Sequence, residues 1–319
     1  MRVLVTGIDG FVGSHAAEFL LTKPDVEVHG TVIDPSSIPN IEHLKARLHL
    51  HTVNILERDR VVDLFSEVKP HRVIHLAGQA FVPAAFSDPV STFQVNILGG
   101  IHVLEGARLL VERAEGSPTV LIVSTGEVYG KVDRLPITEE SRISPNNPYA
   151  ASKAAIDIVA QQYHEAFGLP VIVVRPFNHV GPRQSPVFVC SDFARQIAGV
   201  ANGTRDRTIR VGNIQAKRDF TDVRDVVRAY WLLLENSKGG VYNVCSGKPV
   251  AVEDILNALI RIAGTTVAIV SEPKRLRSYD IPAVYGSNEK LRSLTAWAPA
   301  IPLEQTLRDV YEYWRHASS

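Results

Sequence analysis

A tyrosine and a lysine four residues apart, Tyr149 and Lys153, are the pair in this sequence with the clearest chemical use. Pro148 precedes them and favours the start of a helix, on which such residues share one face about 6 Å apart. An ammonium beside a phenol stabilises the phenolate, so we expect the pKa of the tyrosine to fall below its usual value of about 10. Such a tyrosine can exchange a proton with a substrate hydroxyl or carbonyl while a hydride moves to or from a nicotinamide. The alternative is a solvent-facing helical pair.

A glycine-rich turn near the N-terminus offers a place for that nicotinamide dinucleotide. The chain reads Gly-Ile-Asp-Gly-Phe-Val-Gly from residue 7, directly after a predicted strand and at the start of a predicted helix. Gly7 permits the tight turn, Gly10 lets the backbone approach a pyrophosphate, and Gly13 lets the helix pack closely on the strand. The N–H groups and dipole at a helix N-terminus favour anions. The turn therefore predicts dinucleotide binding by Gly7, Gly10, Phe11, Val12 and Gly13.

The end of the second predicted strand bears on the choice between NAD(H) and NADP(H). Asp34 lies 21 residues beyond Gly13, near the position where a carboxylate accepts the ribose hydroxyls of NAD. No arginine stands at 33 to 37 to hold a 2′-phosphate, although Ser36 and Ser37 are available for hydrogen bonds. We expect a nicotinamide cofactor, NAD(P)H, with NAD(H) preferred. The alternative is that Asp34 only caps the turn before Pro35.

The Gly-x-x-Gly-x-x-Gly spacing, taken with Tyr149 and Lys153, resembles the extended branch of the short-chain dehydrogenase/reductase superfamily. In that branch the catalytic Ser or Thr stands four residues before a tyrosine, here Tyr129, which implies Thr125. Its hydroxyl would hydrogen-bond the reacting oxygen and hold it toward Tyr149. Ser124 is the competing choice, and a strand-end hydroxyl that serves only a turn is the structural alternative. The resemblance implies cofactor contacts at further positions, namely Asn54, Ile55, Leu76, Ala77, Gly78, Asn96, Tyr149, Lys153 and Pro176.

Glu127 bears on which reaction the triad would serve. In nucleotide-sugar dehydratases, which this chain resembles, a glutamate after the threonine removes the C5 proton while a neighbouring acid helps to expel the C6 hydroxyl. Here the preceding residue is Gly126, which has no proton to give. We therefore assign Glu127 to positioning the sugar.

The second half resembles the nucleotide-sugar branch of the same superfamily, most specifically in the stretches 178–182 and 217–225. The resemblance implies that Asn178 faces the sugar diphosphate, and that Arg218 and Arg277 clamp one phosphate each, since a guanidinium fork matches phosphate oxygens. Surface ion pairs with nearby aspartates are the alternative for both arginines.

The resemblance implies reduction of the C4 keto group of GDP-4-dehydro-6-deoxy-D-mannose to give GDP-D-rhamnose. The alternatives are a GDP-mannose 4,6-dehydratase, another nucleotide-sugar dehydratase or C4 epimerase on the same scaffold, or a non-catalytic NAD-sensing protein. The expected partner is a nucleotide sugar, with GDP favoured as the nucleotide. A homodimer through helices 95–113 and 149–167 is expected by family resemblance.

The elements that must position these residues alternate along the first half of the chain. Six runs rich in Val, Ile and Leu predict strands covered on both faces, at 2–6, 26–32, 48–53, 72–76, 120–124 and 171–175. Helical patterns lie between them, at 12–21, 58–68, 95–113 and 150–167. Strands separated by helices predict an α/β fold, a doubly wound parallel sheet of the Rossmann type.

This rhythm ends after Arg175, where three prolines and a glycine in residues 176–186 predict a loop. Later patterns predict helices at 188–201, 223–234, 252–263 and 303–316, and strands at 208–211 and 241–244. We expect a dinucleotide-binding domain of residues 1–175 with a return segment at about 219–247. Residues 176–218 and 248–319 would form a smaller, interleaved substrate-binding lobe.

The composition limits the partners of this chain. Its 319 residues carry 34 Lys plus Arg and 34 Asp plus Glu, so the formal net charge is zero. That balance argues against a nucleic-acid binder held by bulk positive charge, and against an acidic disordered protein. Positive potential for two diphosphates must therefore be local. Cys190 and Cys245 lack metal-ligand spacing, and we expect no metal, two reduced thiols and no signal peptide or membrane span, hence a cytoplasmic protein.

Overall fold

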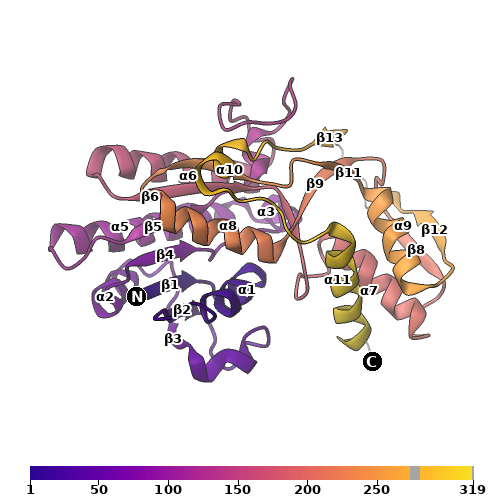
Figure 1. The fold of residues 1–319 in the computed structure, drawn as a ribbon, viewed down its shortest axis with the longest axis horizontal. Helices are drawn as coiled ribbons and strands as arrows, with labels where there is room; N and C mark the ends of the chain where they lie inside the picture. Colours follow the sequence, from indigo (N-terminus) through magenta and orange to yellow (C-terminus); the bar gives the residue numbers. More distant parts are fainter. Residues whose placement is uncertain (274–280, 318–319) are drawn as a thin grey trace.

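The computed structural model describes residues 1–273 and 281–317. Its centre is a parallel sheet in which the strand order is β10-β6-β5-β4-β1-β2-β3 (Figure 1). The predicted fold class is confirmed. Of the six strands predicted in the first half, the first has the predicted bounds, and the other five differ by one residue at one or both ends. The strands are β1 (Arg2–Thr6), β2 (Glu27–Val32), β3 (His49–Thr52), β4 (Arg72–His75), β5 (Thr119–Val123), β6 (Val171–Pro176) and β10 (Gly240–Val244).

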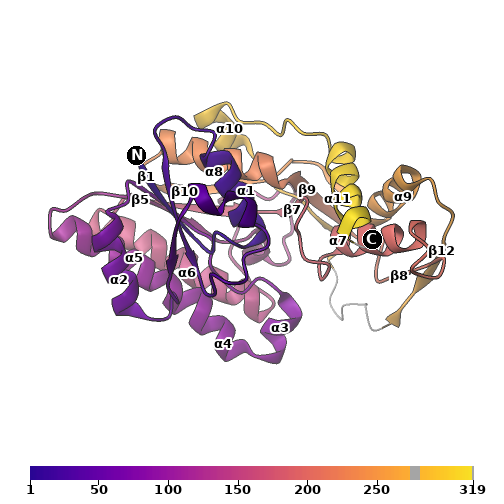
Figure 2. The same cartoon turned by 90° about the horizontal axis from the view of Figure 1, so that it is seen from below.

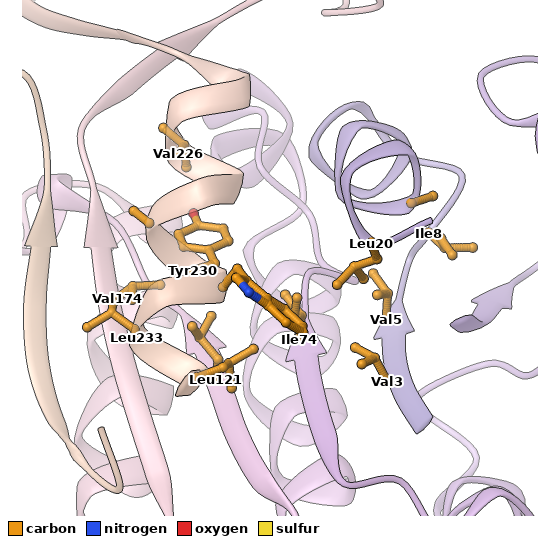
Figure 3. Packing of buried hydrophobic residues seen from close by; sticks show 14 of the residues in the cluster. Val3, Val5, Ile8, Leu20, Ile74, Leu121, Val174, Val226, Tyr230 and Leu233 are labelled. Atoms are coloured by element: carbon orange, nitrogen blue, oxygen red, sulfur yellow. The ribbon is translucent and has the colours of Figure 1, made fainter. Parts of the chain in front are cut away.

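Helices cover both faces of this sheet, which explains why its strands are apolar along their whole length. One face carries α1 (Phe11–Leu20) and α8 (Val223–Asn236). The other carries α2 (Arg58–Val68), α5 (Gly99–Glu112) and α6 (Pro148–Phe167). Figure 3 shows the first layer, in which Val226, Tyr230 and Leu233 of α8 point toward Val174, Leu121 and Ile74 of the strands.

The smaller lobe lies beside one end of the sheet (Figure 2). Its core is formed by α7 (Val189–Ala201), α9 (Val252–Ala263) and α11 (Leu303–Ala317). A small sheet joins it to the larger domain, with β9 (Lys217–Asp222) between β11 (Pro249–Ala251) and β13 (Ala283–Val284), and with β7 (Asn178–Val180) paired to β9. Strands β8 (Thr208–Val211) and β12 (Ala268–Ser271) form a separate parallel pair.

Three sequence expectations are corrected here. The segment expected to be a loop contains β7, because Asn178–Val180 pairs in parallel with β9. The expected domain boundary at 218/219 falls inside β9. Helix α10 (Glu289–Thr295), within the segment assigned to the substrate lobe, instead packs on the larger domain, where Trp297 is fully buried and its Nε1 donates to the carbonyl of Asp225 at 3.0 Å.

The predicted helix at 95–113 is present, and it begins with a π-helical turn, η2 (Gln94–Leu98), that continues directly into α5. Two short helices, α3 (Val82–Ser87) and α4 (Pro89–Phe93), precede it. Two 3₁₀ turns, η1 (Glu42–Arg47) and η3 (Gly126–Tyr129), complete the larger domain. Within residues 1–273 and 281–317, none of the helices combines the length and apolar character that crossing a bilayer requires. Cys190 and Cys245 are both buried free thiols.

Candidate active site

The glycine turn between β1 and α1 is packed so tightly that Gly7 and Gly13 have no room for a side chain. Gly7 has a φ of +67°, and a Cβ built there would lie 3.0 Å from the Cα of Ala77. A Cβ at Gly13 would lie 2.3 Å from the carbonyl oxygen of Gly7. Gly10 precedes α1 without any side-chain cap, so the first turn of α1 keeps its N–H groups open to an anion. The arrangement fits a dinucleotide diphosphate.

The loop after β4 lies against this turn. The Oγ1 of Thr6 accepts hydrogen bonds from the N–H groups of Leu76 and Ala77, both at 3.1 Å. Gly78 follows, and a Cβ there would lie 2.9 Å from the Oδ1 of Asn96 and 3.5 Å from the Nζ of Lys153. Three predicted cofactor residues from separate segments of the chain, Gly78, Asn96 and Lys153, therefore lie next to one another.

Asn96 connects that loop to the helix that carries the tyrosine. Its side chain accepts from the N–H of Gln79 at 2.8 Å and donates to the carbonyl of Gln79 at 2.9 Å. It also donates to the Oγ of Ser152 at 2.8 Å, and that hydroxyl donates to the carbonyl of Tyr149 at 2.7 Å. The π-helical turn η2 places Asn96, which is 2% exposed, at the centre of this chain of hydrogen bonds.

Lys153 and Tyr149 lie on the inward face of α6, at the carboxyl edge of the sheet. Lys153 is 7% exposed, and its Nζ donates to the carbonyl of Val123, the last residue of β5, at 2.9 Å. Thr125 follows two residues later and is also buried. Its Oγ1 accepts from the N–H of Glu127 at 3.2 Å, and its hydroxyl lies beside the phenol of Tyr149 and lowers the pKa of that group. The structure thus brings Thr125, Tyr149 and Lys153 together. Ser124, the competing choice, instead donates to the carbonyl of Lys153 at 3.3 Å.

The acid–base state of this group differs from the sequence expectation. Burial raises the pKa of Tyr149 above its usual value, the charge of Glu127 raises it further, and the hydrogen bond from Thr125 offsets only part of this. Burial lowers the pKa of Lys153 to about 8. The expectation that the pKa of the tyrosine falls is therefore wrong for this structure, because loss of hydration and the charge of Glu127 raise it. Tyr149 is protonated and is suited to give a proton.

Glu127 lies in η3, close enough to Tyr149 for its charge to raise the pKa of the phenol. Its carboxylate accepts from the Nδ2 of Asn147 at 3.0 Å, and the Oδ1 of Asn147 caps α6 by accepting from the N–H of Ala150 at 2.8 Å. Sequence reasoning missed Asn147, although an asparagine before Pro148 is a recognisable helix start. It also missed Ser152 and Gln79, for which the sequence offers no local signal.

The remaining cofactor positions lie along the same edge of the sheet. Asp34 follows β2, is exposed, and accepts from the N–H and Oγ of Ser36 at 2.9 and 2.6 Å. These hydrogen bonds lower its pKa, so it carries a full negative charge. Asn54 caps its own turn by accepting from the N–H of Leu56 at 3.0 Å. Ile55 packs against α5, since a Cβ at Gly99 would lie 2.4 Å from its Cδ1.

Pro176, the last of the predicted cofactor positions, ends β6. The predicted substrate position Asn178 follows it and is exposed on β7, in register with Phe220 of β9. Arg218 lies two residues before Phe220, and its Nη1 donates to the carbonyls of Lys217 and Ile281, both at 2.8 Å. The neighbouring strands thus bring Asn178 and Arg218 to one edge. Arg277 lies outside the described residues.

A family model described as GDP-mannose 4,6 dehydratase matches residues 4–310. The chain belongs to this family. Within it, GDP-6-deoxy-D-mannose reductase from Pseudomonas aeruginosa is 39% identical over 98% of this chain and 97% of its own length. GDP-mannose 4,6-dehydratase from Yersinia enterocolitica is 27% identical over 95% of this chain and 91% of its own.

Solved structures agree with the fold of this family. The chain is similar to RMD from Pseudomonas aeruginosa complexed with NADPH, with a TM-score of 0.85 and 37% identity over 99% of each chain. It is also similar to UDP-glucose 4-epimerase from Thermotoga maritima with UDP-glucose, with a TM-score of 0.89 and 27% identity over the whole of both chains. The similarity extends over both domains and includes the edge where they meet.

Two buried histidines near the cofactor edge make the stability of this family member depend on pH. Burial and the charge of Arg183 lower the pKa of His15 to about 4, and burial with the charge of Lys153 lowers that of His75 to about 3. Unfolded chains bind these protons near pH 6.5, so stability is complete above pH 6.5 and falls as the pH decreases toward 4. We expect each histidine to lower the free energy of unfolding by about 2 kcal/mol when the pH falls from 7 to 5.

Urea unfolding at both pH values measures this loss. His15→Gln, which cannot be protonated, should remove about half of the pH dependence, whereas equal unfolding free energies of the native chain at pH 7 and pH 5 would contradict the prediction.

Proposed function

We propose that this chain is an NAD(P)H-dependent reductase that converts the C4 keto group of GDP-4-dehydro-6-deoxy-D-mannose into the alcohol of GDP-D-rhamnose. The observation that carries the proposal is Tyr149, a phenol that burial keeps protonated, placed with the buried Thr125 and Lys153 at the sheet edge, beside a residue 126 that has no acid to offer. A reduction needs a proton donor at the carbonyl oxygen, whereas a dehydration also needs an acid at C6. The 39% identity to a GDP-6-deoxy-D-mannose reductase supports the same choice.

Each residue at the edge has a role in this reaction. When bound, the nicotinamide supplies a hydride to the sugar C4. The glycine turn and the first turn of α1 would hold the cofactor diphosphate, and Lys153, which uses one of its three donors on Val123, would hold the nicotinamide ribose with another. Tyr149 gives its proton to the sugar O4, and Thr125 orients that oxygen. Glu127, held by Asn147, positions the sugar.

A panel of nucleotide 4-keto-6-deoxysugars, each assayed with NADH and with NADPH, tests this function. We expect consumption of reduced cofactor with the GDP-linked 4-keto sugar, and GDP-D-rhamnose as the product. Equal or faster turnover of a UDP- or dTDP-linked sugar would contradict the nucleotide assignment. No turnover of any member would contradict the reductase itself.

Glu127 supports a second candidate, a GDP-mannose 4,6-dehydratase. Its charge acts on Tyr149, and Asn147 holds its carboxylate on the same side of the site, where a base would act. Incubation with GDP-mannose and no added cofactor separates the two functions. A 4-keto product would favour the dehydratase, and recovery of unchanged GDP-mannose would favour the reductase.

Arg218 should contribute to the affinity for the substrate and leave the affinity for the cofactor unchanged. Its guanidinium is anchored through Nη1 at the edge that Asn178 shares, and charge-assisted hydrogen bonds to phosphate are the strong class. We expect Arg218→Met to weaken GDP binding by about tenfold or more, with the Kd for NADH unchanged. Isothermal titration measures both constants, and Arg261→Met on the exposed side of α9 is the matched control. An equal loss of GDP and NADH affinity would contradict this division.

Asp34 should select NADH over NADPH. Its carboxylate is ionised and lies just beyond β2, where a 2′-phosphate would meet a like charge. We expect Asp34→Asn to lower the ratio of kcat/KM for NADH to that for NADPH by about tenfold. The control is Asp59→Asn, because the Asp59 side chain is 92% exposed on α2. A native chain that prefers NADPH would show that Asp34 does not contact the ribose.

We further propose a homodimer through the outer face of α6 and the helices beside it. Ile158 on α6 is 57% exposed, Leu98 on η2 is 45% exposed, and Phe86 on α3 is 52% exposed. Apolar side chains gathered on one side of a folded domain favour association. Ile158→Asp should convert the dimer to a monomer in light scattering, and a native monomer would refute the interface.

A further inference from the structure

Helix α1, which begins at the glycine turn, contacts β7, the strand that carries Asn178, and the turn that follows it. Figure 2 shows α1 beside β7, and polar contacts join α1 to the turn that follows β7. The contacts involve His15 and Glu18 of α1 and Pro182 and Arg183 of that turn. None of these residues belongs to the proposed cofactor or substrate contacts.

Arg183 forms the main connection. Its Nη1 donates to the Oε1 of Glu18 at 2.6 Å and its Nη2 to the Oε2 of Glu18 at 2.8 Å, a bidentate ion pair. The arginine side chain is only 14% exposed, so water weakens the pair less than it would at the surface. The backbone of Arg183 has a φ of +71°, a left-handed conformation that is costly for a residue other than glycine. The ion pair helps to hold that conformation.

His15 connects the same two segments and is held in one protonation state. Its Nε2 lies 3.0 Å from the carbonyl oxygen of Pro182, which can only accept, so the Nε2 carries the proton. Its Nδ1 lies 2.8 Å from the Nη2 of Arg183, which can only donate, so the Nδ1 accepts. His15 is 5% exposed and neutral. Both contacts are therefore satisfied only by a side chain that donates to the Pro182 carbonyl and accepts from the Arg183 guanidinium.

Aromatic and steric contacts extend the connection to the first residue of α1. The ring of Phe11 stacks on that of His179 with centroids 5.9 Å apart and planes 9° apart. A Cβ at Gly181 would lie 2.5 Å from Val223, so the turn has no freedom to move toward α8. These contacts therefore fix the position of the start of α1 relative to residues 178–184.

We propose that Arg183 and His15 are positioning residues that hold the start of α1, and with it the diphosphate site, against the substrate segment 178–184. Cofactor affinity then depends on two side chains that contact no cofactor. The inference rests on the proposed use of the glycine turn for a nicotinamide dinucleotide.

Direct titration with NADH tests this proposal without requiring turnover. We expect Arg183→Met and His15→Leu to raise the Kd for NADH by about tenfold, the size of a typical coupling between sites. His15→Gln keeps a donor and an acceptor and should bind NADH within about twofold of the native chain. Arg308→Met removes an exposed ion pair with Glu304 on α11 and should change nothing. In steady-state assays the two weakened variants should show a raised KM for NADH, with kcat at saturation nearly native.

A purely structural role predicts a different result. In that case Arg183→Met and His15→Leu would unfold at lower urea concentration while the Kd for NADH stayed native, and the proposal would be overturned. It would also be overturned if His15→Gln lost as much affinity as His15→Leu. If Arg183→Met fails to fold, the two His15 variants decide alone. A native chain that binds NADH but reduces no keto sugar would refute the proposed function and leave this inference standing.

Discussion

Tyr149→Phe is expected to lower kcat by about a thousandfold, the scale of a lost general acid, while the Kd for NADH stays within about twofold. Burial keeps the phenol protonated, and in the proposed reduction its hydroxyl is the group that gives a proton to the reacting oxygen. Phenylalanine keeps the packing of the ring and removes only that hydroxyl. Stopped-flow measurement of NADH oxidation with the GDP-linked 4-keto sugar gives kcat, and a fluorescence titration gives the Kd.

The matched control is Tyr313→Phe, which removes a hydroxyl from α11, a helix of the smaller lobe that carries none of the predicted site residues. It should leave both constants unchanged. If Tyr149→Phe keeps more than about a tenth of the native kcat, another group donates the proton, and the catalytic assignment is wrong.

Gly13→Ala is expected to weaken NADH binding by about a hundredfold or more. The added Cβ would lie 2.3 Å from the carbonyl oxygen of Gly7 and 2.8 Å from the Cα of Ile8, and all of these are backbone atoms that cannot rotate away. The start of α1 must therefore shift relative to β1, and a displacement of about 1 Å at such a site costs about a hundredfold. Isothermal titration with NADH measures the loss.

Gly116→Ala is the control for this substitution, because a Cβ at Gly116 would have nothing within 4 Å. It should keep native affinity and a native unfolding midpoint. A folded Gly13→Ala chain, shown by an unchanged circular dichroism spectrum, that binds NADH with native affinity would show that the turn does not hold the diphosphate.

The parts of the site that could be predicted from the sequence are those set by local backbone geometry. Gly7, Gly10 and Gly13 follow a buried strand at a spacing that only a tight strand-to-helix turn requires, and the structure places them there. Tyr149 and Lys153 share a helix face because four residues make about one turn. The strands were predictable because a sheet covered on both faces needs unbroken apolar runs.

The parts that could not be predicted depend on contacts between distant segments. Nothing near Trp297 in the sequence indicates that it would fill a gap beside α8, or that β7 would pair with β9 across 40 residues of chain. The direction of the pKa shift of Tyr149 was predicted wrongly, because burial arises from the whole fold and the spacing of two residues carries no information about it. The connection from Arg183 to Glu18 spans 165 residues and has no local pattern.

Transfer of deuterium from labelled cofactor tests the proposed reduction most directly. The chain would be supplied with GDP-4-dehydro-6-deoxy-D-mannose and NADH deuterated at the transferred C4 position, and the product would be examined by NMR. We predict one deuterium at the sugar C4 of GDP-D-rhamnose for each NADH consumed. A product without deuterium at C4, or a 4-keto sugar formed from GDP-mannose with no added cofactor, would contradict the reductase.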